Sequence, residues 1–172
     1  MTESTTLDRP DPTLLDWLAG RHVDHEVHEH DLRFTARSTA AAEGVDPRTF
    51  AKVIGLATHE GRIVLAVLDS TDHVDLQKAR RILDTRQVRL LSEAELTHAA
   101  PGCDVGAIPA VGALYGLPTY ADYAVRDDAE ISFNAGSHRF SVRVDRRAWE
   151  RACGTIYADL AVDSGTPAWA RS

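Results

Sequence analysis

Two apolar runs joined by a short polar turn most constrain the fold of this chain. The runs are Val53–Leu56 and Ile63–Leu68, and the turn between them is Thr58–Gly61. Short apolar runs on either side of a glycine-containing turn are typical of two buried strands in a hairpin. The sequence therefore predicts a buried β-hairpin over these residues.

One charged residue, Lys52, lies immediately before the first of these strands. Of the 19 basic residues in the chain, only Lys52 and Lys78 are lysines. A lysine ammonium is a compact point charge with three rotatable donors, whereas the arginine fork suits surface ion pairs. Lys52 is therefore a candidate functional residue, and the alternative is an ordinary lysine whose stem covers apolar surface at a strand end.

The totals favour a single globular domain in a reducing compartment. The chain has 172 residues and is 44% hydrophobic, with no run of membrane-spanning length. The polar start Met1–Thr6 lacks the features of a secretory signal, and Cys103 and Cys153 form neither a disulfide framework nor a metal-ligand pair. We therefore expect a cytoplasmic protein.

The net charge of -7 argues against nucleic-acid binding by bulk electrostatics. It leaves room for a local basic face, and the alternative for each basic cluster is a solvated helix or strand face. The two clusters are Lys78, Arg80, Arg81, Arg86 and Arg89, and Arg139, Arg143, Arg146 and Arg147.

Periodicity and capping signals predict further elements along the chain. We expect a helix over Pro12–Leu18 that Asp11 caps and Gly20 ends, a strand over Val23–His28, and a helix over Ala36–Glu43 capped by Thr35. Further expected elements are helices at Asp75–Leu83, Ser92–Leu96 and Asp145–Gly154, strands at Val88–Leu91, Leu117–Asp122, Glu130–Ala135 and Arg139–Val144, and a weakly structured end at 155–172.

Four histidines, His22, His25, His28 and His30, suggest a metal site near the first predicted strand. In an extended segment His28 and His30 share a face. No Cys or His pair elsewhere completes a ligand set with recognisable spacing, so we expect polar strand-edge histidines and no metal.

Two glycine-containing segments have the character of a site. The loop Asp104–Gly112 is apolar, and its glycines at 106 and 112 allow positive φ or close approach of a ligand. It lacks the Gly-Lys-Ser/Thr ending of a phosphate loop. The segment Asn134–His138 joins two strands at a glycine, and its Ser-His pair lacks the strand-turn-helix elbow of a hydrolase triad.

In this order along the chain, the motifs resemble the YbaK / prolyl-tRNA-synthetase-associated domain family, the aminoacyl-tRNA deacylases that edit mischarged tRNA. The resemblance covers about residues 12–152. It rests on His30, Thr35-Ala36, Gly44-Val45, Ala51-Lys52, Ile63–Leu68, Asp75-Leu76, Val88–Leu96, Gly106–Pro109, Gly116–Asp122 and Phe133–His138.

The resemblance implies a mixed α/β (α+β) fold with a curved, largely antiparallel mixed sheet and flanking helices. It implies a lead-in at 1–11, a deacylase domain at 12–152, a tail at 153–172, and no cofactor. The implied partners are the 3′ end of a mischarged tRNA and an aminoacyl-tRNA synthetase, with no membrane. The implied catalytic residues are Lys52, Gly106, Gly136 and His138, and the implied substrate-binding residues are His30, Ala107, Ile108, Pro109, Gly112, Asn134 and Ser137.

The chain departs from the family pattern at two positions. Family loops often carry a second proline, and here Ala110 follows Pro109, which bears on the rigidity of the loop. In some members an asparagine follows the key lysine, and here Val53 stands in its place, so amino-acid selectivity does not carry over.

Together these features predict a stand-alone hydrolase that removes a small amino acid from mischarged tRNA in trans, from proline tRNA or a similar one. An apolar pocket of Ala107, Ile108 and Val111 would admit small side chains. One alternative is a non-catalytic module of the same fold that binds tRNA or a synthetase. Another is a hydrolase of other small acyl esters.

Overall fold

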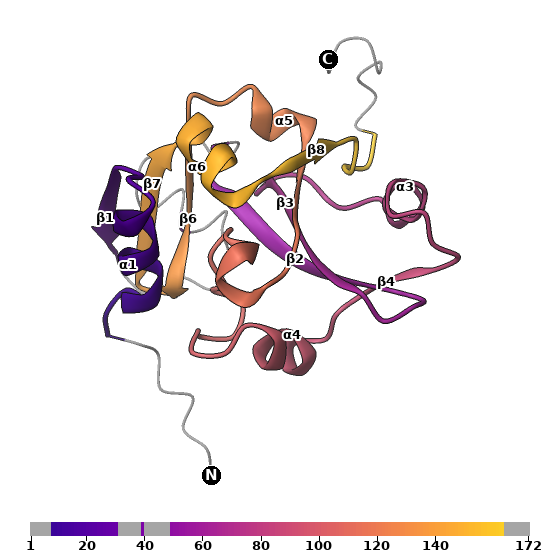
Figure 1. The fold of residues 1–172 in the computed structure, drawn as a ribbon, viewed down its shortest axis with the longest axis horizontal. Coiled ribbons are helices and arrows are strands. Elements are labelled where there is room, and N and C mark those ends of the chain that lie inside the picture. The colour runs from indigo at the N-terminus through magenta and orange to yellow at the C-terminus, as the bar shows by residue number, and fades with distance from the viewer. Residues whose placement is uncertain (1–7, 31–38, 40–48, 164–172) are drawn as a thin grey trace.

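The structure, a computed structural model, describes residues 8–30, 39 and 49–163. These residues form two adjoining sheets with helices around them, which confirms the expected mixed α+β class (Figure 1). In chain order the elements are α1 (Pro12–Gly20), β1 (His25–Glu29), β2 (Ala51–Thr58), β3 (Ile63–Asp69), α3 (Leu76–Ile82), β4 (Val88–Leu90), α4 (Glu93–Ala99), the 3-10 helix η1 (Gly112–Tyr115), β5 (Thr119–Asp122), α5 (Tyr123–Arg126), β6 (Glu130–Ser137), β7 (Phe140–Asp145), α6 (Arg146–Cys153) and β8 (Ile156–Ala158).

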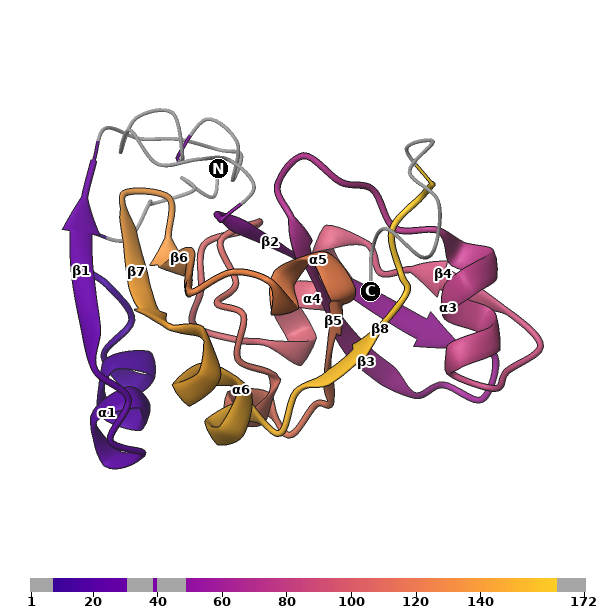
Figure 2. The ribbon, with the colours of Figure 1, turned by 90° about the horizontal axis from the view of Figure 1, so that it is seen from above.

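The two sheets meet edge to edge. The three-stranded sheet has the antiparallel order β1-β7-β6, and the five-stranded sheet has the order β4-β2-β3-β5-β8. In the larger sheet β5 runs parallel to β3, and β8 runs parallel to β5. A parallel bridge between Phe50, just before β2, and Ser132 of β6 joins the sheets. Figure 2 shows β1, β7 and β6 on one side of the molecule and the larger sheet on the other.

The predicted hairpin is confirmed as β2 and β3. Its antiparallel register runs from Ala51 opposite Asp69 to Ala57 opposite Ile63. Strand β3 is almost wholly buried because a separate hydrophobic core lies against each face of the sheet. A strand covered on both faces needs apolar residues in succession rather than in alternation, which explains the uninterrupted run in the sequence.

The two cores hold different helices. One core packs α1 and α6 against the two sheets, with Leu14, Phe133 and Trp149 fully buried. The Trp149 indole N–H also donates to the carbonyl of Ala110 at 2.7 Å, which ties α6 to the loop 104–112. The other core packs α3 against the opposite face of β2 and β3.

Helix ends follow the capping signals of the sequence. The Asp11 carboxylate accepts from Thr13 N at 3.0 Å, with Pro12 at the first helical position of α1. Ser92 and Glu95 form a reciprocal capping box at the start of α4. Gly154 ends α6 in the left-handed conformation. Each of these caps satisfies backbone groups that a helix end would leave unpaired.

The expectation that residues 155–172 are weakly structured is wrong for the first part of that range. Ile156–Ala158 form β8, and the backbone N–H groups of Leu160 and Ala161 both donate to the buried Asp122 carboxylate at 2.9 Å. A three-residue edge strand shows no periodicity from which to predict it.

The sequence patterns did not predict the single-turn helix α5, which follows Asp122. Of the helix expected at 36–43, only Thr39 lies among the described residues, where it is helical and buried. No helix in the described ranges is long and apolar enough to span a membrane.

Lys78 is a structural residue. Its ammonium donates to the carboxylates of Asp159 at 2.9 Å and Asp163 at 2.6 Å and to the carbonyl of Ala161 at 2.8 Å. The Lys78 side chain is only 15% exposed. Three rotatable donors thus fasten the segment after β8 to α3, a geometry that suits an ammonium better than a guanidinium.

Replacing Lys78 with methionine should lower the free energy of unfolding by about 1–3 kcal/mol, because charge-assisted hydrogen bonds are removed. Urea denaturation followed by tryptophan fluorescence measures the decrease. Arg81→Met on the same helix is the matched control, since Arg81 is exposed and has no ion pair in the described ranges. It should change stability by less than about 0.5 kcal/mol. Equal decreases in both variants would contradict the role of Lys78.

Candidate functional site

The edge of β6 that does not face β7 brings together segments that are far apart in the sequence. Ser132 N on this edge donates to the carbonyl of Thr49, just before β2, at 3.1 Å. Farther along the same strand, Gly136 N donates to Ala107 O at 3.0 Å, and Asp104 N donates to Gly136 O at 2.8 Å. The start of β2 and the loop 104–112 therefore share one strand edge, with Asn134 between them.

The glycine loop is fastened to the turn after β6. Gly106 has φ +81°, and a Cβ added there would lie 3.5 Å from the ring of His138. The backbone N–H of His138 donates to Asp104 Oδ2 at 3.2 Å, and its ring Nε2 is hydrogen-bonded to the carbonyl of Val105. Since a carbonyl only accepts, Nε2 carries the proton in this contact. With these two contacts, His138 holds the glycine loop against the turn after β6.

Most side chains of the loop lie in the core. Ala107, Ile108 and Val111 are 5% exposed or less, and Pro109 is buried as well. Gly112 has no room for a side chain, because an added Cβ would lie 2.3 Å from the carbonyl oxygen of Leu117. What the loop offers to solvent is therefore its backbone around Gly106 and the side chain of Val105, rather than an open apolar pocket.

Some backbone N–H groups in and near the loop donate hydrogen bonds within the protein, and others do not. Ala107 N donates to Asp104 O, and Gly136 N donates to Ala107 O. Within the described ranges, the N–H groups of Val105, Gly106 and Ile108 make no hydrogen bond. Val105 and Gly106 are exposed, and Gly106 has no side chain that could shield its N–H. Its N–H is therefore the donor best placed to meet a ligand oxygen.

Lys52 and Asn134 lie on the same face of neighbouring strands. Ala51 and Phe133 both point into the core that holds Trp149. Because strand side chains alternate, Lys52 and Asn134 point to the opposite face. The bridge between Phe50 and Ser132 sets the two strands in parallel register two residues earlier, so Lys52 lies at about the level of Asn134.

Both side chains have polar groups available to a ligand. Within the described ranges, Lys52 makes no hydrogen bond or ion pair, and the buried Oδ1 of Asn134 has no hydrogen-bond partner. Burial lowers the pKa of the Lys52 ammonium from its usual 10.5, and the Asp72 carboxylate raises it by a smaller amount. A half-buried cation beside an unsatisfied amide oxygen is typical of a binding site rather than of a structural contact.

The remaining predicted residues lie at the turn. His30 N donates to Arg139 O at 2.9 Å, which places the end of β1 beside the turn. Ser137 is fully buried, and its hydroxyl accepts from Arg139 N at 3.1 Å. Among the described residues, no group of three or more His, Cys, Asp or Glu side chains could hold a metal ion.

One residue near the site, Asp104, was not singled out individually from the sequence. Asp104 accepts the backbone N–H of His138, and its position directly before a glycine loop is the signal that could have found it. Val53 points away from Lys52 and packs against the cluster that contains Ile108. The residue after the lysine therefore faces the loop from beneath.

Gly136→Ala should lower the free energy of unfolding by about 2–4 kcal/mol, because it combines a positive φ with a steric clash. Gly136 has φ +80°, and its added Cβ would lie 2.9 Å from Asp11 Cβ. Gly102→Ala is the control, since Gly102 has φ +88° and nothing within 4 Å. That variant should be destabilised by only about 1 kcal/mol. Chemical denaturation of both variants measures the difference, and equal destabilisation would show that the clash with Asp11 is unimportant.

Comparison with solved structures supports the same fold. A proposed trans-editing enzyme for prolyl-tRNA synthetase has a TM-score of 0.78 and 23% identity, over 90% of this chain and 100% of that one. A hypothetical protein has a TM-score of 0.80 and 17% identity, over 87% of this chain and 99% of the other. A scaffold used for computational epitope grafting has a TM-score of 0.76 and 25% identity, over 88% and 96% of the two chains.

Comparison of the amino-acid sequence with known proteins and protein families identifies the family of this chain. No curated protein matches the chain. The model of the aminoacyl-tRNA editing domain matches residues 30–152, a span that includes Lys52, the glycine loop and the turn after β6. A match over this much of the chain shows that the protein belongs to the aminoacyl-tRNA editing domain family.

Proposed function

We propose that this protein is a deacylase that acts in trans on mischarged aminoacyl-tRNA, removing a small amino acid from proline tRNA or a similar tRNA. Membership of the editing-domain family supports the reaction class. The structural neighbour described as a proposed trans-editing enzyme for prolyl-tRNA synthetase supports the choice of proline tRNA as the substrate. The observation that carries the proposal is the β6 edge, where Lys52, Asn134 and the glycine loop lie beside one another.

The chemistry is hydrolysis of an ester. A water molecule adds to the carbonyl carbon, the bond from that carbon to the ribose oxygen breaks, and the ribose oxygen takes a proton. The products are the free amino acid and the tRNA with its terminal hydroxyl restored. An aminoacyl ester is already an activated acyl group, so a site that orients the water and stabilises the oxyanion suffices.

Each residue of the site has a role in this reaction. The N–H of Gly106 faces the developing oxyanion, a contact whose removal typically raises the barrier by ~3 kcal/mol. The Lys52 ammonium contacts the terminal phosphate, ribose or carbonyl, and Asn134 accepts a hydrogen bond from the substrate. His138 and Gly136 hold the loop in position. A neighbouring ribose hydroxyl of the substrate assists the water, so no side-chain base is required.

A non-catalytic module that binds tRNA or a synthetase is the second candidate. Two observations favour it. Ala110 replaces the second proline of the family loop, and the chain has an acidic net charge of -7. A hydrolase of other small acyl esters is the third candidate, and the same experiment separates all three.

Deacylation of a panel of mischarged tRNAs tests the proposal. The panel contains proline tRNA charged with alanine or cysteine, and tRNAs mischarged with serine or threonine. Lys52→Ala should lower kcat/KM roughly 100-fold, because the half-buried cation beside Asn134 is removed. Lys78→Met is the matched control among the two lysines of the chain and should keep its activity below its melting temperature.

The outcomes assign the function. Turnover that is abolished in Lys52→Ala and kept in Lys78→Met supports the deacylase. Binding of tRNA without turnover supports the module, and cleavage of simple esters alone supports the third candidate. Wild-type activity in Lys52→Ala would remove Lys52 from the catalytic residues.

The two lysines should also titrate apart. Burial lowers the pKa of Lys52 below 10.5. Burial also acts to lower the pKa of Lys78, but its hydrogen bonds to Asp163 and Asp159 outweigh burial and raise that pKa above 10.5. In protein that carries ¹³C,¹⁵N-labelled lysine, NMR should show one lysine signal that titrates below this value and one above it. Burial of the charged Lys52 ammonium destabilises the folded state. As pH rises through the lowered pKa towards 10.5, the ammonium loses its proton, and the contribution of Lys52 to the free energy of unfolding increases. Coincident titrations would contradict the environment assigned to Lys52.

A further inference from the structure

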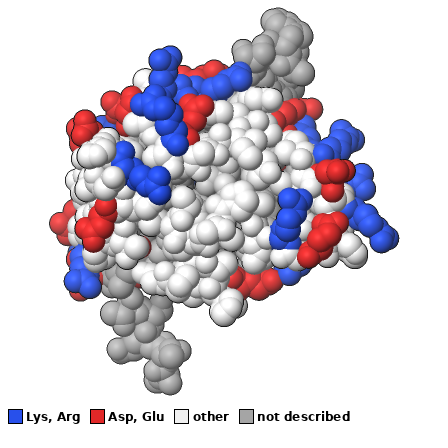
Figure 3. Space-filling model, in the orientation of Figure 1, with Lys and Arg blue, Asp and Glu red and all other residues white. Residues whose placement is uncertain are grey.

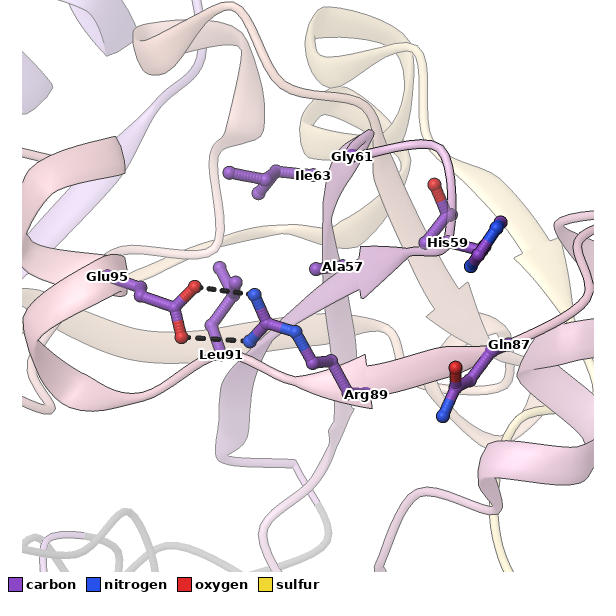
Figure 4. Close-up of a pocket in the computed structure, with 9 residues that line it drawn as sticks. Ala57, His59, Gly61, Ile63, Gln87, Arg89, Leu91 and Glu95 are labelled. Carbon is purple, nitrogen blue, oxygen red and sulfur yellow. Dashed lines mark hydrogen bonds and ion pairs between the residues drawn. The ribbon is translucent and has the colours of Figure 1, made fainter.

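A second concave site lies at the far end of the hairpin. It is a depression of about 450 Å³ on the face of the five-stranded sheet opposite Lys52. From Lys52 to Ala57 along β2 is about 17 Å at the usual rise per residue. Figure 4 shows the lining residues, which come from β2, β3, β4, α4 and the turns between them. They are Ala57, Thr58, His59, Gly61, Ile63, Gln87, Arg89, Leu91 and Glu95.

The floor of this depression is apolar. Ala57 is paired with Ile63 across the hairpin and with Arg89 on β4, so the side chains of all three emerge on the same face. Leu91 closes one side. The stem of Arg89 therefore lies over apolar surface, and its guanidinium stands at the wall.

The guanidinium of Arg89 is held in a fixed plane. Its two terminal nitrogens donate to the two oxygens of Glu95 at 2.8 and 2.7 Å, as the dashed lines in Figure 4 mark. The hydrogen bonds from Arg89 are the largest cause that lowers the pKa of Glu95, to about 2, so the pair persists at neutral pH. Glu95 in turn accepts from Ser92 N at 3.1 Å. A flat cation whose terminal nitrogens are engaged presents its faces to a ligand.

The helix that carries Glu95 is itself closely seated. A Cβ added at Gly55 would lie 2.7 Å from Leu91 Cδ1 and 2.8 Å from Leu96 Cδ1. The absence of a side chain at Gly55 thus lets the start of α4 lie directly on β2. The wall formed by Arg89 and Glu95 is fixed by this packing.

The opposite end of the depression offers hydrogen-bonding groups. The side chains of His59 and Gln87 are exposed and make no hydrogen bond in the part of the chain that the structure describes. Figure 4 shows both on the side away from Glu95. An amide and an imidazole supply donors and acceptors for the edge of a heterocycle.

One arginine without an ion pair adjoins this end of the depression. Arg86, directly before Gln87, is exposed and has no ion pair in the described ranges. Arg80 and Arg81 are also exposed, but they lie on α3, which packs against the opposite face of β2 and β3. Lys78, predicted in the same basic cluster, is committed to two carboxylates. The exposed acids nearby are Glu60, Asp84 and Glu93. Figure 3 shows basic and acidic side chains together at the right-hand edge of the molecule, beside a broad uncharged central face.

We propose that this depression binds one unpaired base of the RNA substrate, stacked on the guanidinium of Arg89 and contacted at its edge by Gln87 and His59. The inference rests on the proposed function, because it assigns a part of the same tRNA. Unpaired RNA bases are commonly recognised by stacking on arginine planes and by hydrogen bonds to their edges. Arg86, next to Gln87, contacts an adjoining phosphate.

The chemistry of the wall disfavours an anion as the ligand. Both terminal nitrogens of Arg89 already donate to Glu95, so the pair has no net charge to attract a free phosphate or carboxylate. The exposed plane of the guanidinium remains, and a planar uncharged base suits it. The volume is ample for a base with its ribose.

Uncharged proline tRNA with 2-aminopurine placed in turn at each unpaired position of its 3′ end tests the inference. Binding to the wild-type protein should quench one position. Arg89→Lys keeps the charge and removes the plane, so it should abolish that quenching and weaken binding about fivefold or more. Arg81→Lys is the matched control and should keep both, since Arg81 is exposed on α3, which packs against the other face of the sheet. Gln87→Ala, which leaves the ion pair intact, should weaken binding without changing the melting temperature.

A salt series tests the role assigned to Arg86. Replacing Arg86 with glutamine should reduce the slope of log affinity against log salt by about one. An unchanged slope would remove Arg86 from the interface.

Three outcomes would overturn the inference. If the protein deacylates tRNA but quenches 2-aminopurine fluorescence at no position, this inference is overturned and the proposed function is retained. Equal affinities of Arg89→Lys and Arg81→Lys would do the same. Absence of both tRNA binding and deacylation in the wild-type protein would overturn the proposed function and this inference together.

Discussion

The hydrogen-bonding requirement of one edge of β6 determines the geometry of the site. β6 is buried along nearly its whole length, and its other edge is taken by β7. Buried peptide groups without partners are costly, so the free edge has to be covered. Two segments share it, the backbone before β2 at Ser132 and the glycine loop at Gly136. The site is thus placed by backbone pairing, and the side chains of Lys52 and Asn134 come with the strands that carry them.

The electrostatics of the chain make recognition local. A net charge of -7 repels RNA at a distance, so affinity has to come from particular cations at particular places. The two lysines illustrate the division, because Lys78 is neutralised by two carboxylates while Lys52 has no ion pair in the described ranges. The arginines around the depression lie about one hairpin's length away from Lys52. A tRNA end that binds at both places, as proposed, has to be extended and to pass from one face of the larger sheet to the other.

Much of the fold follows from local sequence signals, and its exceptions have physical reasons. The hairpin and the caps Asp11 and Ser92 are set by short-range patterns that the sequence displays directly. β8 is defined by tertiary contacts, because Asp122 binds the backbone that follows it from 38 and 39 positions away. No periodicity in the sequence could reveal that partnership.

The site is predictable to a similar degree. The resemblance to a family singled out segments that lie together, since the loop and the turn are hydrogen-bonded to each other. It did not indicate that the loop's apolar side chains fill the core, because burial depends on what packs against the loop from α6 and β3. Asp104 was missed for the same reason, as its role depends on a backbone N–H 34 residues away.

The missing second proline of the loop has a structural replacement. A proline restricts φ and so reduces the freedom of the loop even in the unfolded chain. Ala110 has no such restriction, but its side chain is fully buried and its carbonyl accepts the Trp149 indole N–H at 2.7 Å. Tertiary contact in the folded state thus fixes what the family's proline fixes by covalent structure. Because a positioned backbone donor, and not a reactive side chain, is what ester hydrolysis requires of this loop, the departure at Ala110 is compatible with catalysis as long as the hydrogen bond with Trp149 is intact.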